Sequence, residues 1–411
     1  MRRRVVITGI GVIAPNGIGK ENFWNALKEG KSGIKKITSF DTSDLPVKIA
    51  GEVDNFNPED YIEDRKKIRR MARFSQFAVA CAKMAVEDAN LDLKTIDLKK
   101  MLVVLGVSTN AMDVFEKEYL NFLKYKNRFY NPYFIASGTP NVGVGEVLNE
   151  LGIETSICTI STGCASGLDS VGVGYNEIKK GSYDVAIVGS SEASITPLLM
   201  AGLSAAKIMS LRNDEPERAS RPFDKLRDGG VLSEGAGFIV IEELKHALLR
   251  KAHIYCEIIG YGEMGEKERN IPGKGLEMSM RKCIKESGFF PKEIDFISAH
   301  APSDPFLDYY ETIAIKNIFG EYAYKIPVTS IKSMIGNPFG AAGVLQLIGG
   351  ILAFEEGIIS PTINYEYPDS LCDLDYVPNE YRKYNPNTCL INSHGFGGSN
   401  SSLLIKKYED K

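Results

Sequence analysis

Short apolar runs rich in β-branched residues alternate with longer segments of helical pattern along the whole chain, and this alternation limits the possible folds more than any other feature. Strands that are apolar on both faces and separated by helices are typical of parallel sheet in an α/β fold. The runs fall into two successive sets, at 3–12, 101–108, 155–161, 183–191 and 236–243, and then at 255–262, 295–301, 326–333, 388–395 and 402–408. We therefore predict a duplicated α/β architecture, with an N-terminal half at 1–250 and a C-terminal half at 251–411.

Length and composition agree with this prediction. A chain of 411 residues exceeds one ordinary core, which favours two domains or two fused halves. Hydrophobic residues at 44% and charged residues at 25% are close to the averages of globular proteins, so neither disorder nor a fibrous repeat is indicated. A net charge of -4 gives no global reason to expect nucleic acid as a partner. No stretch reaches the ~18 uninterrupted apolar residues of a membrane span.

Cysteine usage indicates a reducing environment. The chain has 7 cysteines, scattered and without a CxxC pair, which argues against a zinc site or a disulfide framework. The first residues, MRRRVVITGIGVIA, suit either a signal peptide or a buried strand. We favour the strand, because Pro15-Asn16-Gly17 is a turn into a helix and not the small-residue exit of a signal peptide. We therefore expect a cytoplasmic protein without a metal site.

Cys164 is the candidate nucleophile. It follows a predicted strand and opens a segment that we predict to be a helix ended by Gly181. A thiol at a helix N-terminus has its thiolate stabilised by the dipole and by free N–H groups, so we expect a lowered pKa. Most free cysteines are inert core residues, and packing is the alternative here. The strand-turn-helix context favours the nucleophile.

A thiol nucleophile usually works with a base, and the chain has only 4 histidines. His246 and His253 flank a charged helical stretch, and we expect them at the surface. His300 and His394 each end a predicted strand before a turn that contains Gly or Pro. Ligands of α/β sheets bind beyond the carboxyl ends of the strands, so we expect these two histidines to converge on Cys164.

Two further segments have a predicted role. Residues 70–91 have helical spacing of apolar residues, and basic side chains gather just before this helix. That basic cluster is either a solvated helix face or a docking site for an acidic partner. Residues 111–135 mix aromatic and charged side chains without a clean period, and we expect a cap or a dimer contact there.

Several motifs together resemble one family. They are STGCASG at 161–167, SRPFDKLRDG at 220–229, SEGAG at 233–237, SIKSMIGNPFGAAG at 330–343, CDLDYVPNEYR at 372–382 and NSHGFGGSN at 392–400. The chain resembles the β-ketoacyl-[acyl carrier protein] synthases of the elongating, or type two, class, and the motifs are collinear over nearly its whole length. The resemblance implies the thiolase fold, in which two pseudo-repeated α/β halves form a five-layered αβαβα core, and normally a homodimer.

The resemblance also implies roles for residues at matching positions. Cys164 would take the acyl chain from a carrier-protein thioester. The backbone N–H groups of Cys164 and Phe396 would form the oxyanion hole, and Phe396 would gate the acyl pocket. His300 matches the first catalytic histidine, and Lys332 and Glu311 match a charged pair that supports the site.

The resemblance further implies an acyl carrier protein as the partner. The family docks its acidic carrier at positions that are basic here: Lys66, Lys67, Arg69, Arg70 and Lys207. No cofactor is expected, because the substrates arrive on the phosphopantetheine arm of the carrier. We expect a homodimer, with a heterodimer as the alternative, and neither nucleic acid nor a membrane span.

The chain departs from the family at the second catalytic histidine, where Asn337 stands instead. Two donors ordinarily hold the malonyl thioester oxygen while carbon dioxide leaves, and losing one such donor costs ~3 kcal/mol. An asparagine amide can donate a hydrogen bond but cannot exchange a proton near neutral pH. A Cys-His-Asn set also resembles the initiating synthases and the chalcone synthases, which still decarboxylate malonyl units.

Other departures surround this one. Residues 301–304 read Ala-Pro-Ser-Asp where the family has Gly-Thr-Ser-Thr, so recognition of the phosphopantetheine arm is in question. Gln346 stands where a glutamate is usual, and His394 replaces a phenylalanine beside the gate. We expect His394 to lie within reach of Cys164 and to compensate partly for the missing imidazole.

The leading hypothesis is therefore decarboxylative Claisen condensation of an acyl group on Cys164 with a malonyl-carrier thioester, in fatty acid or polyketide-type synthesis. One alternative is an acyl transferase that loads without efficient decarboxylation. Another is a non-catalytic partner subunit of a heterodimer, although such partners typically lose the thiol that this chain keeps.

Overall fold

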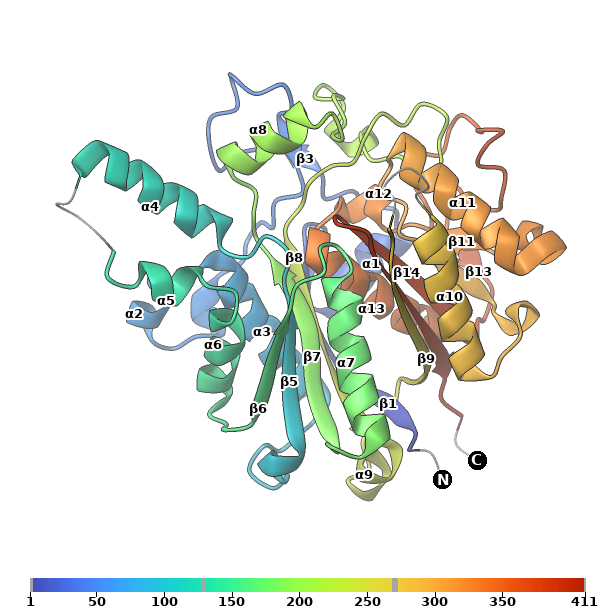
Figure 1. The fold of residues 1–411 in the computed structure, drawn as a ribbon, viewed down its shortest axis with the longest axis horizontal. Coiled ribbons are helices and arrows are strands. Elements are labelled where there is room, and N and C mark those ends of the chain that lie inside the picture. The colour runs from blue at the N-terminus through green and yellow to red at the C-terminus, as the bar shows by residue number, and fades with distance from the viewer. Residues whose placement is uncertain (1–2, 127–130, 268–272, 410–411) are drawn as a thin grey trace.

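The computed structural model describes residues 3–126, 131–267 and 273–409, and its centre is one large mixed sheet (Figure 1). The first half contributes β1 (Val5–Ala14), β5 (Met101–Gly106), β6 (Ser156–Ile160), β7 (Val185–Glu192) and β8 (Gly235–Glu243). The second half contributes β9 (Cys256–Gly265), β10 (Phe296–Ser298), β11 (Val328–Thr329), β14 (Thr388–Gly395) and β15 (Ser399–Lys407). These strands confirm the positions of the predicted apolar runs, including the buried strand near the N-terminus.

The two halves repeat one strand order. In space the first half runs β6-β5-β7-β8-β1, and the second runs β11-β10-β14-β15-β9. If the main strands of each half are counted along the chain, both halves have the spatial order third, second, fourth, fifth, first. The first strands meet antiparallel, with Val5 opposite Ile258, and this pairing joins the halves into one sheet. The repetition confirms the duplicated α/β class.

The prediction of parallel sheet was wrong for part of the structure. Strand β5 pairs parallel with β6 and β7, and β10 pairs parallel with β11 and β14. The pairs β7/β8, β1/β8, β14/β15, β9/β15 and β1/β9 are antiparallel. Burial on both faces makes a strand apolar whichever way its neighbour runs, so composition could not separate the two arrangements.

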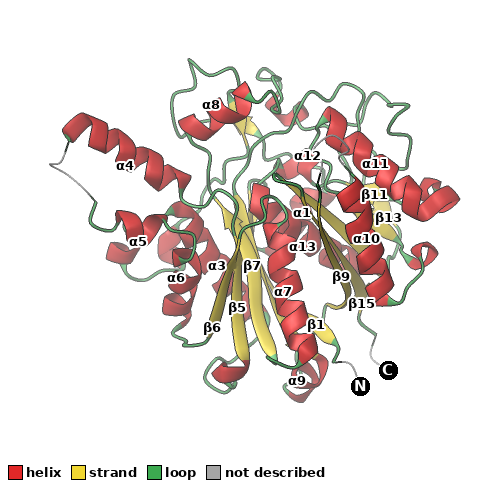
Figure 2. Ribbon diagram, in the orientation of Figure 1, coloured by secondary structure: helices red, strands yellow, loops and turns green. Residues whose placement is uncertain are grey.

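Helices cover both sides of the strands (Figure 2). Helix α3 (Arg73–Asp88) packs on β1, β8 and β7, and α10 (Lys274–Ser287) packs on β9 and β15. Between the two half-sheets lie α7 (Ser166–Lys180) and α13 (Ala342–Glu356), which contact each other. This gives the layers helix, sheet, helices, sheet, helix. Helix α3 confirms the helix predicted at 70–91, and α7 ends at Gly181 with φ 87°, as predicted.

The remaining elements are shorter or peripheral. They are β2 (Gly17–Ile18), α1 (Lys20–Lys28), β3 (Lys35–Lys36), β4 (Ile49–Ala50), α2 (Arg65–Ile68), α4 (Met112–Tyr125), α5 (Phe134–Gly138), α6 (Val142–Leu151), α8 (Pro197–Ala205), α9 (Leu244–Leu249), α11 (Pro305–Phe319), α12 (Lys332–Ile335), β12 (Ile358–Ile359) and β13 (Arg382–Lys383).

Helices α7 and α13 approach closely because glycines face the contact. A Cβ on Gly167 would lie 2.6 Å from the carbonyl oxygen of Gly340, and a Cβ on Gly343 would lie 2.7 Å from Cγ of Leu168. Residues Phe339–Glu356 are long and apolar enough to cross a membrane, but 89% of them are buried inside the protein. This stretch is therefore a core helix, and its burial brings the halves together next to Cys164.

Helices α4 and α5 project from one end of the molecule, away from the strands (Figure 1). They carry exposed apolar side chains, among them Tyr119, Leu120, Leu123 and Ile135. The predicted cap or dimer-contact segment at 111–135 therefore forms largely helix, and residues 127–130 of it lie outside the described residues. All seven cysteines are free.

Candidate active site

One cavity of about 260 Å³ brings together residues that are far apart in the sequence. Cys164, His300, Asn337, His394 and Phe396 all line it. Its apolar walls come from Leu203, Ile208, Met209, Val231, Leu232, Leu307 and Phe339. The cavity lies where β6, β10 and β14 end and where α7 begins. As expected, the two histidines at strand ends line the same cavity as the thiol.

The turn before α7 fixes the position of Cys164. Gly163 has φ 62°, and a Cβ there would lie 3.0 Å from the backbone nitrogen of Phe396. Ser393 Oγ donates a hydrogen bond of 2.8 Å to the carbonyl oxygen of Cys164. The sulfur receives hydrogen bonds from the Asn337 side chain and from the Phe396 backbone N–H. Cys164 is only 3% exposed, so donors and apolar walls surround its thiol.

Burial dominates the acidity of this thiol. It raises the pKa of Cys164 to about 11, although the nearby Lys332 charge and the hydrogen bonds from Asn337 and Phe396 act in the opposite direction. The expectation of a lowered pKa was therefore wrong, because desolvation of the thiolate outweighs stabilisation at the start of α7. At neutral pH roughly one thiol in ten thousand is ionised, so nucleophilic attack by this sulfur needs a base.

His300 is held through its backbone and one ring nitrogen. Its N–H donates to Glu311 Oε1 at 3.0 Å, and its carbonyl oxygen accepts a hydrogen bond from Lys332 Nζ. Its Nδ1 accepts the backbone N–H of His394 at 3.2 Å. Burial and the positive charge of Lys332 hold the pKa of His300 well below its ordinary value, so its imidazole is neutral at physiological pH.

Glu311 and Lys332, the charged pair that the resemblance implied, interact through space and contact the backbone of His300 from two sides. Glu311 accepts backbone N–H groups of His300 and Ala301 and the amide of Asn392. Burial raises the pKa of Glu311. The carboxyl group and the ammonium group thus approach the His300 backbone from its N–H and its C=O respectively, and they interact through space.

Lys332 has a neutral partner instead. Its Nζ donates to Gln346 Oε1 at 2.9 Å, and Gln346 Nε2 donates to Ala299 O at 2.7 Å. Burial lowers the pKa of Lys332 to about 8. The neutral Gln346 does not oppose this lowering of the Lys332 pKa, whereas a carboxylate in contact with Lys332 would favour its ammonium form.

His394 lines the same cavity. Its Nδ1 lies 2.7 Å from Asn400 Oδ1, and its ring centroid is 5.9 Å from that of His300. Phe396 is 61% exposed, and its ring is 6.1 Å from that of Phe339. Asn400 was not predicted, although it ends the NSHGFGGSN motif. Its role depends on the turn between β14 and β15, which pairs residue 394 with residue 400 across the hairpin.

The segment that replaces the expected Gly-Thr-Ser-Thr is internally bonded. Ser303 Oγ accepts the backbone N–H of Arg221 at 3.0 Å. Asp304 caps α11 by accepting the N–H groups of Phe306 and Leu307 at 2.8 and 2.9 Å. Pro302 and Asp304 still line the cavity, so the chain passes the expected arm-binding position with both polar side chains already engaged.

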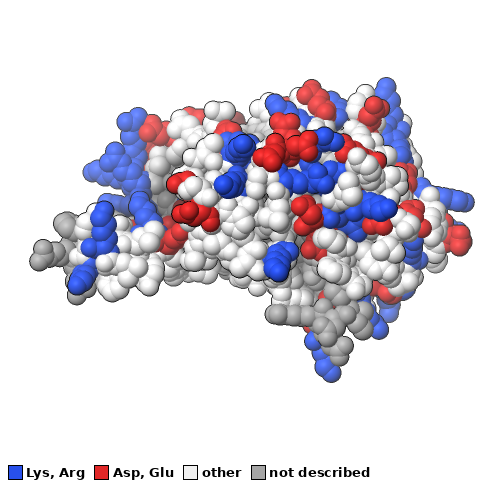
Figure 3. All heavy atoms as spheres, turned by 90° about the horizontal axis from the view of Figure 1, so that it is seen from above, with Lys and Arg blue, Asp and Glu red and all other residues white. Residues whose placement is uncertain are grey.

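Four of the predicted docking residues lie on α2 or just after it. Helix α2 lies at the end of the molecule that also holds α4 and α5, and Figure 3 shows Lys and Arg side chains gathered at this end. Lys66, Lys67, Arg69 and Arg70 are exposed. Lys67 Nζ lies 2.8 Å from Glu150 Oε1, and the Arg70 guanidinium lies 4.0 Å from the ring centroid of Tyr133.

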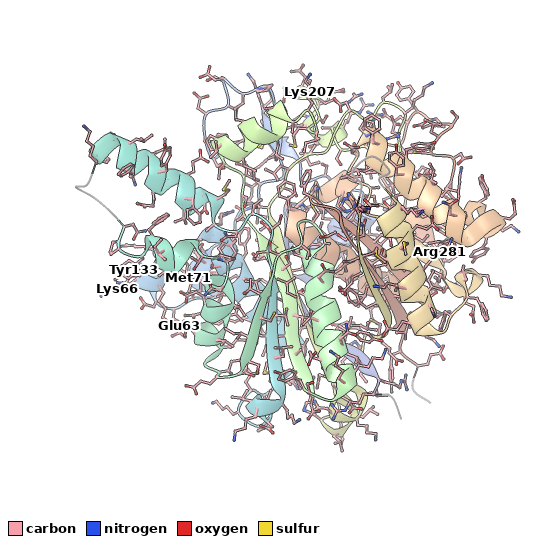
Figure 4. The ribbon with its side chains drawn as sticks, viewed as in Figure 1. Glu63, Lys66, Met71, Tyr133, Lys207 and Arg281 are labelled. Carbon is pink, nitrogen blue, oxygen red and sulfur yellow. The ribbon has the colours of Figure 1, made fainter. Side chains whose placement is uncertain are left out.

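Lys207 lies elsewhere. It follows α8 and precedes Ile208 and Met209, which line the cavity. Figure 4 places Lys66 and Lys207 on separate parts of the surface. The five basic residues therefore do not form one patch on a single chain, and Lys207 is the one beside the cavity.

Comparison with known proteins gives a consistent result over the whole chain. Residues 2–247 match the family described as beta-ketoacyl synthase, N-terminal domain, and residues 255–366 match beta-ketoacyl synthase, C-terminal domain. A 3-oxoacyl-[acyl-carrier-protein] synthase 2 of Coxiella burnetii is 42% identical over 100% of both chains. A protein of the same name from Synechocystis is 38% identical over 99% of both chains.

Solved structures agree. The ishigamide ketosynthase/chain length factor has a TM-score of 0.94 and 32% identity over 100% of both chains. A type II PKS acyl-carrier protein in complex with its ketosynthase bound to the hexaketide gives a TM-score of 0.90 and 33% identity, covering 99% of this chain and 100% of that chain.

Proposed function

Because this chain belongs to the beta-ketoacyl synthase family and is a ketosynthase condensing enzyme, we propose that it joins an acyl group on Cys164 to a malonyl unit delivered by an acyl carrier protein. The observation that carries the proposal is the single cavity shared by Cys164, His300 and Asn337. The N-terminal half supplies the thiol, and the C-terminal half supplies the groups that surround it. The substrates arrive on phosphopantetheine in the cytoplasm, and no other cofactor takes part.

The first step is acyl transfer. The sulfur of Cys164 attacks the carbonyl carbon of the acyl-carrier thioester, and the carrier leaves as a free thiol. Negative charge develops on the carbonyl oxygen in the tetrahedral intermediate, and the backbone N–H groups of Cys164 and Phe396 stabilise it. Rotation of the exposed Phe396 side chain opens the acyl pocket.

The second step is decarboxylation and condensation. His300 and Asn337 donate hydrogen bonds to the thioester oxygen of the malonyl unit. As carbon dioxide leaves, the electrons of the broken C–C bond move toward this oxygen. The resulting carbanion attacks the thioester carbon on Cys164, the carbon–sulfur bond breaks, and a β-ketoacyl chain remains on the carrier. Asn337 fills the place of the second histidine by donating without exchanging a proton.

The carrier protein docks through its acidic surface. Lys207 beside the cavity supplies one contact, and the α2 cluster of Lys66, Lys67, Arg69 and Arg70 supplies a second positively charged surface. These two surfaces are separate on one chain. The α2 cluster of one protomer therefore either binds a carrier whose arm enters the cavity of the other protomer, or guides the approach of the carrier electrostatically.

The functional unit is a homodimer. Strand β6 lies at an edge of the large sheet and bears Ile157, which is 48% exposed. The apolar side chains of α4 and α5 add to this surface. An unpaired edge strand with exposed apolar residues is a surface that proteins normally cover. A heterodimer with a related chain would use the same surface.

The test combines two measurements. Intact-protein mass spectrometry after mixing with an acyl-carrier protein detects acylation, and release of labelled carbon dioxide from a malonyl carrier detects decarboxylation. Loading with release supports condensation, loading alone supports an acyl transferase, and the absence of both supports a partner subunit. Cys164→Ser must abolish loading, and Cys158→Ser, which removes a partly exposed cysteine of β6, must leave it intact.

A further inference from the structure

The two histidines of the cavity have opposite hydrogen-bonding roles. Nδ1 of His300 accepts a backbone N–H, that of His394, at 3.2 Å. A neutral imidazole carries one proton, and a nitrogen that accepts a hydrogen bond does not hold it. The proton of His300 is therefore on Nε2, so this ring offers a donor to the cavity. A substrate oxygen can accept a hydrogen bond from this Nε2–H. The His300 ring, however, has no free lone pair that could take up a proton.

Asn400 fixes the other ring. The side-chain nitrogen of Asn400 donates to the carbonyl oxygens of Met264 at 3.2 Å and Gly398 at 3.0 Å. This network assigns the atom that faces His394 as the amide oxygen, which only accepts. At 2.7 Å it receives the Nδ1–H of His394, so Nε2 of the neutral ring keeps its lone pair. His394 thus offers an acceptor where His300 offers a donor.

Among the residues that the structure describes, no hydrogen-bond acceptor is found for the proton of the Cys164 thiol. The hydrogen bonds that its sulfur receives, from Asn337 and from the N–H of Phe396, come from donors. Asn337 Oδ1 is buried and has no hydrogen-bond partner within the described part of the chain, but an amide oxygen does not take up a proton near neutral pH. Desolvation keeps the thiol protonated, so loading requires a group that removes the proton as sulfur attacks.

Two other titratable groups lie at or near the cavity, Asp304 and Lys332, and both make hydrogen bonds within the protein. Asp304 accepts two backbone N–H groups at the start of α11. Lys332 donates to the carbonyl oxygen of His300 and to Gln346. Among the described residues that line the cavity, His394 has an imidazole nitrogen with a free lone pair, and an imidazole is ordinarily a stronger base than a carboxylate such as that of Asp304.

We propose that His394 is the base that takes the proton of Cys164 during acyl loading, directly or through one water, and that Asn400 is the residue that positions it. This inference rests on the proposed condensing function and adds a residue to its first step. As the carbon–sulfur bond to Cys164 forms, its proton moves to His394 Nε2. As the carrier sulfur leaves, the same proton moves from His394 to that sulfur, and the histidine returns to its starting state.

The decisive variant is His394→Phe, which installs the residue that the family usually has at this position. The backbone N–H of residue 394 remains, so His300 keeps its orientation. We expect the rate of single-turnover acyl loading, measured by intact-protein mass spectrometry, to fall by at least about 100-fold. This is in the range that general-base catalysis contributes. His394→Gln should be equally slow and serves if the phenylalanine variant does not fold. His253→Phe, at an exposed histidine, is the matched control and should load at the wild-type rate.

Rescue distinguishes proton transfer from packing. In His394→Ala, added imidazole should restore loading in a concentration-dependent way, because a small base can enter the vacated space, whereas a purely structural defect would not respond. Wild-type loading rates in His394→Phe and His394→Gln, or no rescue of His394→Ala, would overturn the assignment of His394. Failure of the wild-type protein to load at all would instead count against the proposed function.

Discussion

The thiol of Cys164 is both buried and surrounded by hydrogen-bond donors, and these two conditions act on its pKa in opposite directions. Burial prevails, and the pKa rises to about 11. In the proposed mechanism, a thiol with such a pKa becomes reactive only when a base and a substrate are present together. The proposed reactivity of Cys164 therefore depends on the assembled site.

The raised pKa predicts a steep pH dependence of alkylation. In a Cys158→Ser background, the rate of Cys164 modification by iodoacetamide should rise about tenfold per pH unit from pH 7 to pH 10, because only the thiolate reacts. Mass spectrometry after timed quenching measures the rate. A rate that levels off below pH 9 would show that the thiolate forms far more easily than burial allows.

Asn337 allows a second prediction at this scale. Replacing it with alanine removes one donor to the malonyl oxygen, so carbon dioxide release should fall by about 100-fold, which corresponds to ~3 kcal/mol. Acyl loading of Cys164 should fall much less. The variant Asn337→His restores a donor and should decarboxylate at least ten times faster than Asn337→Ala, measured with the same labelled malonyl carrier. Equal loss of both steps in Asn337→Ala would argue for a structural role.

Motifs indicated candidate site residues that the cavity brings together, but the sequence did not reveal the hydrogen bonds between them. Cys164, His300 and His394 could be predicted because a strand end or a strand-to-helix turn is visible in local sequence. The partners of Lys332 and Glu311 could not be predicted: the carboxyl accepts backbone N–H groups, while the ammonium donates to Gln346. Such partners depend on the exact approach of three separate segments, which no local pattern specifies.

At the scale of elements, the contact between α7 and α13 sets the geometry of the site. Both helices are glycine-rich where they meet, so the first turn of α7, which follows Cys164, lies close to the segment that carries Asn337. Strand positions could be predicted because apolar β-branched runs are local, whereas strand direction could not. The direction depends on connections such as the tight turn between β14 and β15, which makes that pair antiparallel.

The same contact predicts a stability effect. Gly167→Ala places a methyl group 2.6 Å from the carbonyl oxygen of Gly340, so the helices must separate. We expect the free energy of unfolding to fall by about 1–3 kcal/mol in urea denaturation. Gly145→Ala in α6 has no atom within 4 Å of the added Cβ and should leave stability unchanged or raise it. Similar values for both variants would contradict tight packing at α7.

At the scale of the whole molecule, the duplicated sheet brings Cys164 from one half to the same cavity as His300 and His394 from the other. Neither half alone contains both the thiol and the groups that surround it. Helices α4 and α5 and the edge strand β6 leave an apolar surface at one end, which the proposed dimer covers. The basic surface on α2 lies at this same end of the molecule.

The proposed dimer predicts a change in assembly. Ile157→Glu places a charge in the exposed edge of β6 and should convert the dimer to a monomer in analytical ultracentrifugation, because an unpaired charge would be buried in the interface. Leu249→Glu changes a leucine that is 87% exposed on α9, far along the chain from β6, and should leave the dimer intact. A wild-type protein that sediments as a monomer would refute the proposal.

The most direct test of the central claim is the product itself. When wild-type protein is mixed with an acyl carrier thioester and a malonyl carrier thioester, mass spectrometry of the carrier should show a 3-oxoacyl chain two carbons longer than the acyl group supplied. The product should require both thioesters and should disappear in Cys164→Ser. Detection of acylated Cys164 without any elongated carrier, or an elongated carrier made equally well by Cys164→Ser, would contradict the account.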